Sequence, residues 1–290
     1  MPKISSPFRY PGGKSQLYPY IKHLLEVNDV HGTYIEPFAG GAGVAIELLL
    51  RGDVERILIN DYDKSIYSVW NAILNHKKKL IQKIKETPIT FEEWENQKSI
   101  FLKNKNSQNS FEGGFATLYL NRTNVSGIIT GGPIGGKNQT GNYKIDARFN
   151  KDELIRKIKL IHEKKSQIIL TRKDANQLIP YIKENFATDN TFIFFDPPYY
   201  AQGKNLYMSF IDYSEHQKLF DNIQILNEYK WIVTYDTAHE INRIYKSINN
   251  SFTYTLDYTA NSRRKANEYL FANDNTIVDS FGKVELLKNK

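Results

Sequence analysis

Short apolar runs alternate with amphipathic stretches in two separate parts of the chain. In the first part, Tyr34-Ile35 and Ile57-Leu58-Ile59 have the composition of short buried strands, and residues 44–50 between them have that of a helix. The second part predicts strands at 168–170, 192–195 and 231–233, and helices at 175–185, 214–227 and 238–248. This alternation predicts an α/β fold with a doubly wound, mostly parallel sheet that is covered by helices on both faces.

The pattern changes near the end of the chain. Residues 252–258 and 267–271 are rich in Tyr, Thr and Phe, which favour strands. Two such strands in succession, without a helix between them, predict an antiparallel pair. We therefore expect a C-terminal β-hairpin that closes the sheet and makes it mixed.

Residues 75–151 interrupt the alternation. The stretch begins with a lysine-rich helix over residues 77–85, and it becomes rich in glycine beyond a helix that ends near Arg122. We interpret it as an inserted, mostly helical module. The expected division is one α/β domain at 1–74 and 152–290, with residues 75–151 as a separate module inserted into it.

Composition narrows the classes of function. The net charge of +7 and the pI of about 9.2 favour a polyanionic partner, because lysine and arginine that neutralise phosphates supply sequence-independent affinity. The chain has no cysteine, which excludes disulfides, thiolate zinc sites and a cysteine nucleophile. No apolar run approaches the roughly 18 residues of a membrane span, so we expect a cytoplasmic protein without membrane contact.

The four residues Asp196-Pro197-Pro198-Tyr199 carry the most chemistry. They follow the apolar run at 192–195, and ligands bind at the carboxyl ends of strands in open α/β sheets. The prolines stiffen the backbone, so the Asp196 carboxylate and the Pro197 carbonyl could accept both hydrogens of a flat amine and direct its lone pair to a methyl group. Tyr199 would stack on the aromatic base that carries this amine. The alternative is that Asp196 caps a helix and the prolines mark a loop.

A glycine-rich turn follows the first predicted strand. It begins at Glu36, contains Phe38 and Gly40, and leads into a helix, so its backbone can approach a ligand closely. Asp61 follows at the end of the next strand, where an acid accepts hydrogen bonds from ribose hydroxyls. We assign Asp61 to a ribose and Asp63 to the cap of the following helix, although either acid could be the cap.

A second glycine pair precedes Lys14 near the start of the chain. Phe8 to Ser15 lacks both the preceding strand and the glycine spacing of a nucleotide triphosphate loop. We expect Lys14 to meet the methionyl carboxylate of S-adenosylmethionine and Tyr10 to cover that cofactor, with Phe38 as a second aromatic wall. Each of these side chains could instead serve packing.

These motifs, in this order, resemble the Dam-like family of adenine-N6 DNA methyltransferases across most of the chain. The matching stretches are Tyr10-Pro11-Gly12-Gly13-Lys14, Ile35 to Gly40, Leu58-Ile59-Asn60-Asp61, Asp196-Pro197-Pro198-Tyr199, Thr234 to Thr237 and Arg263 to Leu270. The resemblance implies a Rossmann-like methyltransferase fold and S-adenosylmethionine as cofactor, with S-adenosylhomocysteine as product and no metal. It places catalysis on Asp196, Pro197 and Tyr199, and cofactor contacts on Tyr10, Lys14, Asp61, Asp174 and Asp196. From the glycine-rich turn we expect Glu36, Phe38 and Gly40 as further cofactor contacts. Asp174 could equally be a helix cap.

The partner implied by the resemblance is double-stranded DNA, from which the target base must be extruded. Leu120 to Asn124 is similar to the family's helix end before the target-recognition hairpin, but residues 128–139 differ from the family pattern, so GATC is only the default target. Phosphate contacts are expected from Lys137, Lys144 and Arg148, and base contacts from Arg122, Asn124, Asn138 and Gln139. Arg263, Arg264 and Lys265 form a second basic cluster. The alternative for the glycine-rich stretch is a solvated loop, and the alternative for the second basic cluster is a surface charge run that binds no phosphate.

Other readings remain open from the residues themselves. Cytosine-N4 methyltransferases share the apparatus but usually carry Ser in place of Asp196, and enzymes acting on RNA bases or protein glutamine would fit Asn there better. A catalytically inactive DNA-binding relative is the alternative of another class. The expected chemistry is direct in-line methyl transfer, for which a monomer suffices, although a dimer on DNA is possible.

Overall fold

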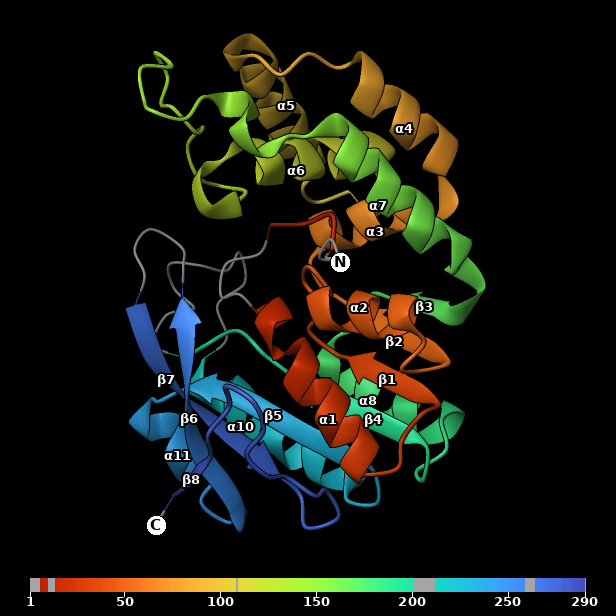
Figure 1. Ribbon diagram of the computed structural model, residues 1–290, viewed down its shortest axis with the longest axis vertical. Helices are drawn as coiled ribbons and strands as arrows, with labels where there is room; N and C mark the ends of the chain where they lie inside the picture. Colours follow the sequence, from red (N-terminus) through yellow and green to blue (C-terminus); the bar gives the residue numbers. More distant parts are fainter. Residues whose placement is uncertain (1–5, 10–13, 108, 201–211, 259–263, 290) are drawn as a thin grey trace. The chain divides into compact units, whose positions relative to one another are not determined.

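The computed structural model describes residues 6–9, 14–107, 109–200, 212–258 and 264–289. The chain forms two compact units (Figure 1). Unit 1 comprises Met1–Pro11 and Asp63–Ser166, and unit 2 comprises Gly12–Tyr62 and Gln167–Lys290.

Within the described ranges, unit 2 contains an eight-stranded sheet with strand order β3-β2-β1-β4-β5-β7-β6-β8. The strands are β1 (Thr33–Glu36), β2 (Arg56–Asn60), β3 (Ile168–Thr171), β4 (Thr191–Phe195), β5 (Lys230–Asp236), β6 (Asn250–Tyr258), β7 (Arg264–Ala272) and β8 (Leu287–Lys288). Strands β1 to β5 are parallel, and β7 runs antiparallel to both β5 and β6. The predicted doubly wound mixed sheet and its closing hairpin are confirmed.

The strand order reverses direction between β1 and β4. Successive strands run outward from β1 to β3 on one side and from β4 to β5 on the other. In open α/β sheets, such a switch point leaves a crevice outside the carboxyl ends of the strands. Glu36, Asp61, Asp196 and Asp236 lie at or directly after those ends, so the sheet gathers acidic residues from four strands at one edge.

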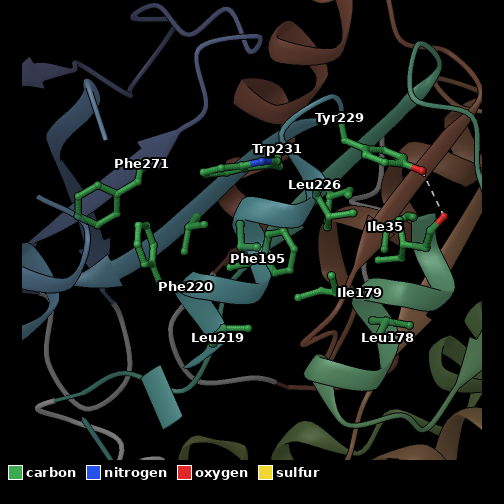
Figure 2. Close-up of a cluster of buried hydrophobic side chains, with 14 of the residues drawn as sticks. Ile35, Leu178, Ile179, Phe195, Leu219, Phe220, Leu226, Tyr229, Trp231 and Phe271 are labelled. Atoms are coloured by element: carbon green, nitrogen blue, oxygen red, sulfur yellow. Dashed lines mark hydrogen bonds between the residues drawn. The ribbon is translucent and has the colours of Figure 1, made fainter. Parts of the chain in front are cut away.

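Helices cover both faces of this sheet (Figure 1). They are α1 (Tyr18–Val27), which follows the short 3₁₀ turn η1 (Lys14–Leu17), α2 (Gly43–Arg51), α8 (Ala175–Asn185), α10 (Tyr213–Ile223), followed by η5 (Gln224–Leu226), and α11 (His239–Ile244). Figure 2 shows the core under α8 and α10, where Ile179 and Leu219 pack with Phe195 and Trp231 of the sheet. Side chains alternate along a strand, so every second residue of the central strands points to the opposite face of the sheet, which α1 and α2 cover (Figure 1).

Unit 1 is helical in its described residues. Its helices are α3 (Lys64–Asn75), α4 (Lys77–Glu86), α5 (Phe91–Asn104), α6 (Phe111–Thr123) and α7 (Lys151–Glu163), with short 3₁₀ turns η2 (Val125–Gly127) and η3 (Ile145–Arg148). Helix α6 is buried along most of its length and packs on α3 and α5. A Cβ at Gly114 would lie 2.7 Å from the carbonyl oxygen of Ser68, so glycine is needed where α6 meets α3. This packing makes unit 1 longer than the predicted module at 75–151.

The glycine-rich stretch after α6 is built from turns. Asn124 and Pro133 form one isolated antiparallel bridge, and no strand of two or more residues occurs between them or up to Arg148, a range that is fully described. Gly127, Gly135 and Gly136 have positive φ angles, which interrupt the extended geometry of a ladder. The hairpin that the family resemblance implied after α6 is thus reduced to a single bridge. In the described parts of the chain, no helix has both the length and the apolar character needed to span a membrane.

One histidine in the core of unit 2 predicts acid sensitivity. His216 is buried, its Nδ1 lies 2.9 Å from the Tyr235 hydroxyl, and burial lowers its pKa to about 4. A histidine whose folded pKa lies below its unfolded value stabilises the fold above pH 6.5 and loses that contribution as the pH falls to 4. The loss is about 3 kcal/mol.

His216→Phe keeps an aromatic ring and removes the titrating group. We expect the free energy of unfolding of the variant to fall by about 3 kcal/mol less than that of the wild type between pH 7 and pH 4. Urea unfolding, read by hydrogen exchange on peptides of unit 2, measures this difference. The matched control is His31→Phe, because the side chain of His31 is 64% exposed. Equal pH dependence in wild type and His216→Phe would contradict the assignment.

Candidate active site

Asp196 follows β4 directly and is held by two side chains. Its Oδ1 lies 2.9 Å from Lys14 Nζ and accepts a hydrogen bond of 2.9 Å from the Thr234 hydroxyl. Thr234 belongs to β5, the parallel neighbour of β4, so adjacent strands bring the two side chains together. Asp196 is thus bound to side chains in the described structure, and not to the backbone of a following helix.

Lys14 also contacts Glu268, a residue of β7. Lys14 Nζ lies 2.9 Å from Glu268 Oε2 and donates to Thr234 Oγ1 at 3.2 Å. Glu268 Oε1 accepts a 2.5 Å hydrogen bond from the hydroxyl of Tyr199. Tyr199 is only 6% exposed. The three hydrogens of the ammonium group are engaged, so the predicted contact of Lys14 with a methionyl carboxylate would require Nζ to give up a partner.

Burial and charge perturb the acids of this site. Burial raises the pKa of Asp196, an effect that Lys14 opposes and Glu268 adds to. Burial alone would lower the pKa of Lys14, but Asp196 and Glu268 outweigh it and raise that pKa. Burial raises the pKa of Glu36 to about 8, against the hydrogen bonds from Ala45 N–H and the Tyr34 hydroxyl. Two acids share one lysine here, so the site favours a ligand that carries positive charge.

The glycine-rich turn after β1 is tied to the end of β2. Gly40 has a φ of 48°, and its N–H donates to Asp61 Oδ2 at 2.8 Å. Glu36 is buried and accepts a hydrogen bond of 3.0 Å from Ala45 N at the start of α2. Phe38 is half-buried and packs against the core under α8 and α10. The structure therefore brings Glu36, Gly40 and Asp61 to one edge, as the sequence predicts.

Asn60 joins three strand ends at this edge. Its amide donates to the carbonyls of Pro37, at 2.9 Å, and Lys173, at 3.0 Å. Its Oδ1 accepts 2.8 Å hydrogen bonds from the Thr171 hydroxyl and from Lys173 N–H. The loops after β1 and β3 are thereby fixed to the end of β2.

Two acids assigned from sequence act as helix caps. Asp63 accepts from Ser65 N–H and Ile66 N–H at the start of α3, which confirms its predicted role. Asp174 accepts a 2.9 Å hydrogen bond from Asn176 N–H at the start of α8. The capping alternative for Asp174 is thus present in the structure, and its contact with a cofactor adenine stays a prediction.

Asn124 supports the turn after α6 from inside unit 1. It is fully buried, its amide donates to the carbonyls of Ile128 and Ile129, and its Oδ1 accepts a 2.6 Å hydrogen bond from Trp94 Nε1. Its polar atoms are therefore used within the unit, and its contact with a base stays a prediction. The amide of Gln139 is similarly committed, to the carbonyls of Ile134 and Gly136.

Three arginines of unit 1 lie close enough to affect one another. Burial lowers the pKa of Arg122 to about 10, and Arg9 and Arg148 add to the decrease. The backbone of Arg9 is held by Asn121, whose amide side chain both accepts from Arg9 N–H at 2.8 Å and donates to Arg9 O at 2.7 Å. A Cβ at Gly127 would lie 2.3 Å from that same carbonyl oxygen, so only glycine permits this approach. Mutual repulsion of this kind favours an anionic ligand.

Four of the remaining candidates for DNA contacts are exposed in the described structure. Lys137, Asn138 and Lys144 are exposed, and Lys144 Nζ donates to Gln139 O at 2.5 Å. Arg148 is exposed, with its guanidinium 5.6 Å from the ring centroid of Tyr143. Tyr10 and Arg263 lie outside the described residues, as does the side chain of Arg264.

Comparison with known proteins decides the class of this site. The family model of the D12 class N6 adenine-specific DNA methyltransferases matches residues 10–260. The chain belongs to this family. The match contains Asp196, Lys14 and Thr234 and the arginines of unit 1 apart from Arg9, whereas Glu268 lies beyond its end. Adenine-N6 methylation of DNA is therefore the activity of this D12 chain, and methylation at cytosine N4 is not favoured.

Two known proteins are similar to this D12 methyltransferase. The type II methyltransferase M.MjaIII of Methanocaldococcus jannaschii is 25% identical over 221 residues, which cover 72% of this chain and 73% of the relative. Among solved structures, the rRNA methyltransferase aviRa of Streptomyces viridochromogenes is 10% identical with a TM-score of 0.39, covering 92% of this chain and 88% of that one. The fold assignment rests on the strand order of unit 2.

Membership of a methyltransferase family implies S-adenosylmethionine as methyl donor, and the side chains at the strand ends fit it. The cofactor carries a sulfonium and an ammonium group, which suit the acid excess around Asp196 and Glu268. Its ribose hydroxyls suit an acid such as Asp61 at the end of β2. The positive φ of Gly40 permits a tight turn beside Asp61. These observations agree with a cofactor at the edge that Glu36 and Asp61 share.

Sequence reasoning missed the buried partners of Asp196 and Tyr199. Glu268 and Thr234 were recognised only as parts of late motifs, and Asn60 only as part of a strand end. For Glu268 a signal existed, because Ala266, Glu268 and Leu270 alternate on one face of β7. An acid on the buried face of a strand needs a partner, and that partner is Lys14.

Proposed function

We propose that the chain transfers the methyl group of S-adenosylmethionine to N6 of an adenine extruded from double-stranded DNA, with Asp196 accepting the amine hydrogens. The anchoring of Asp196 at the end of β4 carries this proposal. Lys14 and Thr234 both bind Oδ1. The second carboxylate oxygen has no partner among the described residues, so it is the one that faces a reacting amine.

The chemistry follows from the acceptors at the catalytic motif. When bound, S-adenosylmethionine supplies a methyl group on a positively charged sulfur. Asp196 and the Pro197 carbonyl accept the two N6 hydrogens and localise the nitrogen lone pair for attack on the methyl carbon. An N6 that gains a methyl group must lose a proton, and Asp196 would accept it, because burial raises the pKa of this carboxyl. Tyr199 is proposed to stack on the base.

The cofactor is proposed to lie along the carboxyl ends of β1, β2 and β4. Asp61 would bind the ribose, and Glu36 and Asp196 would face the positively charged groups. The residues proposed to contact it are Tyr10, Lys14, Glu36, Phe38, Gly40, Asp61, Asp174 and Asp196.

The charge distribution supports DNA binding by unit 1. This unit holds 21 of the 39 Lys and Arg residues but 10 of the 32 Asp and Glu residues, a net charge of +11. The target-recognition module at 75–151 lies within it. Lys137, Lys144 and Arg148 are proposed to bind phosphates, and Arg122 and Asn138 to contact bases. Arg263 and Arg264 are proposed as further phosphate contacts.

Arg148→Ala is expected to weaken binding to DNA of any sequence. The substitution removes one phosphate contact, so the slope of log K against log salt concentration should decrease by about 1. Fluorescence anisotropy across a salt series measures the slope. Arg156→Ala is the matched control, because Arg156 is already paired with Glu153 at 2.8 Å. An unchanged slope for Arg148→Ala would remove this residue from the phosphate contacts.

Nucleoside analysis tests the proposed activity directly. Double-stranded DNA is incubated with the protein and S-adenosylmethionine, digested, and separated by mass. N6-methyldeoxyadenosine is the expected product, and sequencing of modified bases gives the target site, with GATC as the default expectation. A product of N4-methyldeoxycytidine would contradict the proposal.

The cellular setting is proposed by analogy with the type II relative. We infer a cytoplasmic enzyme that acts as a monomer and protects DNA in a restriction-modification system. Expression in a host, followed by digestion of its DNA with endonucleases of known specificity, tests the protection.

A further inference from the structure

Glu268 is a buried carboxylate that the proposed chemistry does not use. Its side chain can carry a negative charge, yet the residue is only 1% exposed, because it lies in strand β7 of the core sheet. A buried charge costs several kcal/mol unless it is paired and fully hydrogen-bonded. Its Oε1 accepts from the Tyr199 hydroxyl at 2.5 Å, and its Oε2 binds the Tyr254 hydroxyl at 2.5 Å and Lys14 Nζ at 2.9 Å.

The partners of Glu268 are the groups that surround the catalytic acid. Tyr199 belongs to the catalytic motif, and Lys14 binds Asp196. Lys14 Nζ also lies 5.1 Å from the ring centroid of Tyr199, so one carboxylate fixes both members of a cation–π pair. Tyr254 of β6 stands opposite Glu268 in the strand register and anchors it from the side remote from Asp196.

We propose that Glu268 is a positioning residue for methyl transfer, which holds the Tyr199 ring and shares Lys14 with Asp196. The inference rests on the proposed role of Asp196 as acceptor. If Glu268 were absent, Lys14 would bind Asp196 alone, and its charge would weaken the carboxylate as an acceptor of the amine hydrogens. Tyr199 would also lose the hydrogen bond that orients its ring.

A pH profile separates this role from simple support of the fold. Five titratable groups interact electrostatically with Asp196. They are Lys14, Glu268, Glu36, Tyr34 and Tyr235. Among them, the Glu268 carboxylate raises the pKa of Asp196. Removal of that charge lowers this pKa, so the acidic limb of the kcat profile should move to lower pH. Loss of folded protein would lower kcat at every pH without moving the limb.

The experiment compares Glu268→Gln with Tyr254→Phe. For Glu268→Gln we expect kcat at pH 8 to fall about 10- to 100-fold, while KM for DNA changes little and the acidic limb moves to lower pH. Tyr254→Phe keeps the charge of Glu268 and loosens its anchor. We therefore expect a smaller fall in kcat and an acidic limb at the wild-type position.

Two controls have the same chemistry elsewhere in unit 2. Tyr229→Phe removes a buried hydroxyl that donates to Phe186 O at 2.8 Å, and Glu47→Gln removes a buried acid that is paired with Arg51. Both should keep the wild-type kcat and pH profile. The binding of S-adenosylmethionine by each variant is measured by calorimetry.

The outcomes are distinct. A wild-type kcat and pH profile in Glu268→Gln would overturn the inference. It would also be overturned if kcat fell as much in the control Tyr229→Phe as in Tyr254→Phe. If Glu268→Gln does not fold, an unchanged kcat in Tyr254→Phe overturns it instead. A wild type that makes no N6-methyldeoxyadenosine refutes the proposed function itself. A wild type that makes it, with Asp196→Ala inactive and Glu268→Gln normal, refutes the role of Glu268 alone.

Discussion

Asp196→Ala is expected to lower kcat for DNA methylation by about 10³-fold, which corresponds to about 4 kcal/mol of transition-state stabilisation. The variant loses the acceptor for the amine hydrogens and the group placed to take the N6 proton. Lys14 keeps Glu268 as a partner, 2.9 Å from its Nζ, so the substitution does not strand a buried cation. The fold and the affinity for DNA should therefore be retained.

Asp196→Asn is expected to be nearly as inactive as Asp196→Ala. Lys14 and the Thr234 hydroxyl both direct hydrogens at Oδ1. The amide oxygen of an asparagine must take that position, which leaves its NH2 group where the second carboxylate oxygen was. A donor would then face the amine hydrogens, and no lone pair would accept them.

Single-turnover methylation with quantified N6-methyldeoxyadenosine measures these effects, together with calorimetry for S-adenosylmethionine and anisotropy for DNA. Asp53→Asn is the matched control, because Asp53 is also bound by a lysine and a hydroxyl, those of Lys22 and Tyr18. It should retain the wild-type kcat. Substantial turnover by Asp196→Asn would show that the second oxygen is not the acceptor.

The fold of unit 2 could be predicted because each element is one contiguous segment. The runs at 192–195 and 231–233 are apolar throughout, as expected for strands buried on both faces, and the structure pairs Ile193 with Trp231. The position of Asp196 at the end of β4 could be predicted for the same reason, since it is next to its strand in sequence. Local pattern therefore suffices where the chemistry and the element are adjacent.

The interactions that complete the site join distant segments, and no local pattern contains them. Lys14 and Glu268 are 254 positions apart, and they meet because β7 inserts beside β5. The limits of unit 1 illustrate the same difficulty. The apolar faces of α3 and α7 show that these helices pack, but not that α3 packs on α6 at Gly114.

Residues in capping positions were ambiguous for a different physical reason. A short polar side chain at a helix end can satisfy backbone N–H or carbonyl groups whether or not it also binds a ligand. Asp174 and Asn124 were candidates for ligand contacts, and both bind backbone groups of their own unit. Asn124 is fully buried and Asp174 is half-buried, so the two differ in access to solvent but not in the backbone contacts that make the sequence ambiguous.

Lys14→Met is expected to lower the free energy of unfolding of unit 2 by about 3–5 kcal/mol at pH 8, because it strands Asp196 and Glu268 without their shared cation. Burial already raises the pKa of Asp196, and Lys14 opposes that increase. Without the lysine, the folded pKa of Asp196 lies further above its unfolded value. The variant is then least affected at acidic pH, where Asp196 binds a proton, and its deficit grows as the pH rises through the folded pKa of that carboxyl.

A urea series at pH 4.5, 6 and 8, read by pulsed hydrogen exchange on peptides of β4, β5 and β7, resolves this deficit from the unfolding of unit 1. Lys22→Met is the control, since it breaks the partly exposed pair with Asp53, at 2.6 Å. We expect that control to cost less than about 1 kcal/mol at every pH. A deficit for Lys14→Met that stays constant between pH 4.5 and 8 would mean that the lysine acts through packing of its chain, and that Asp196 and Glu268 do not depend on it for their charge.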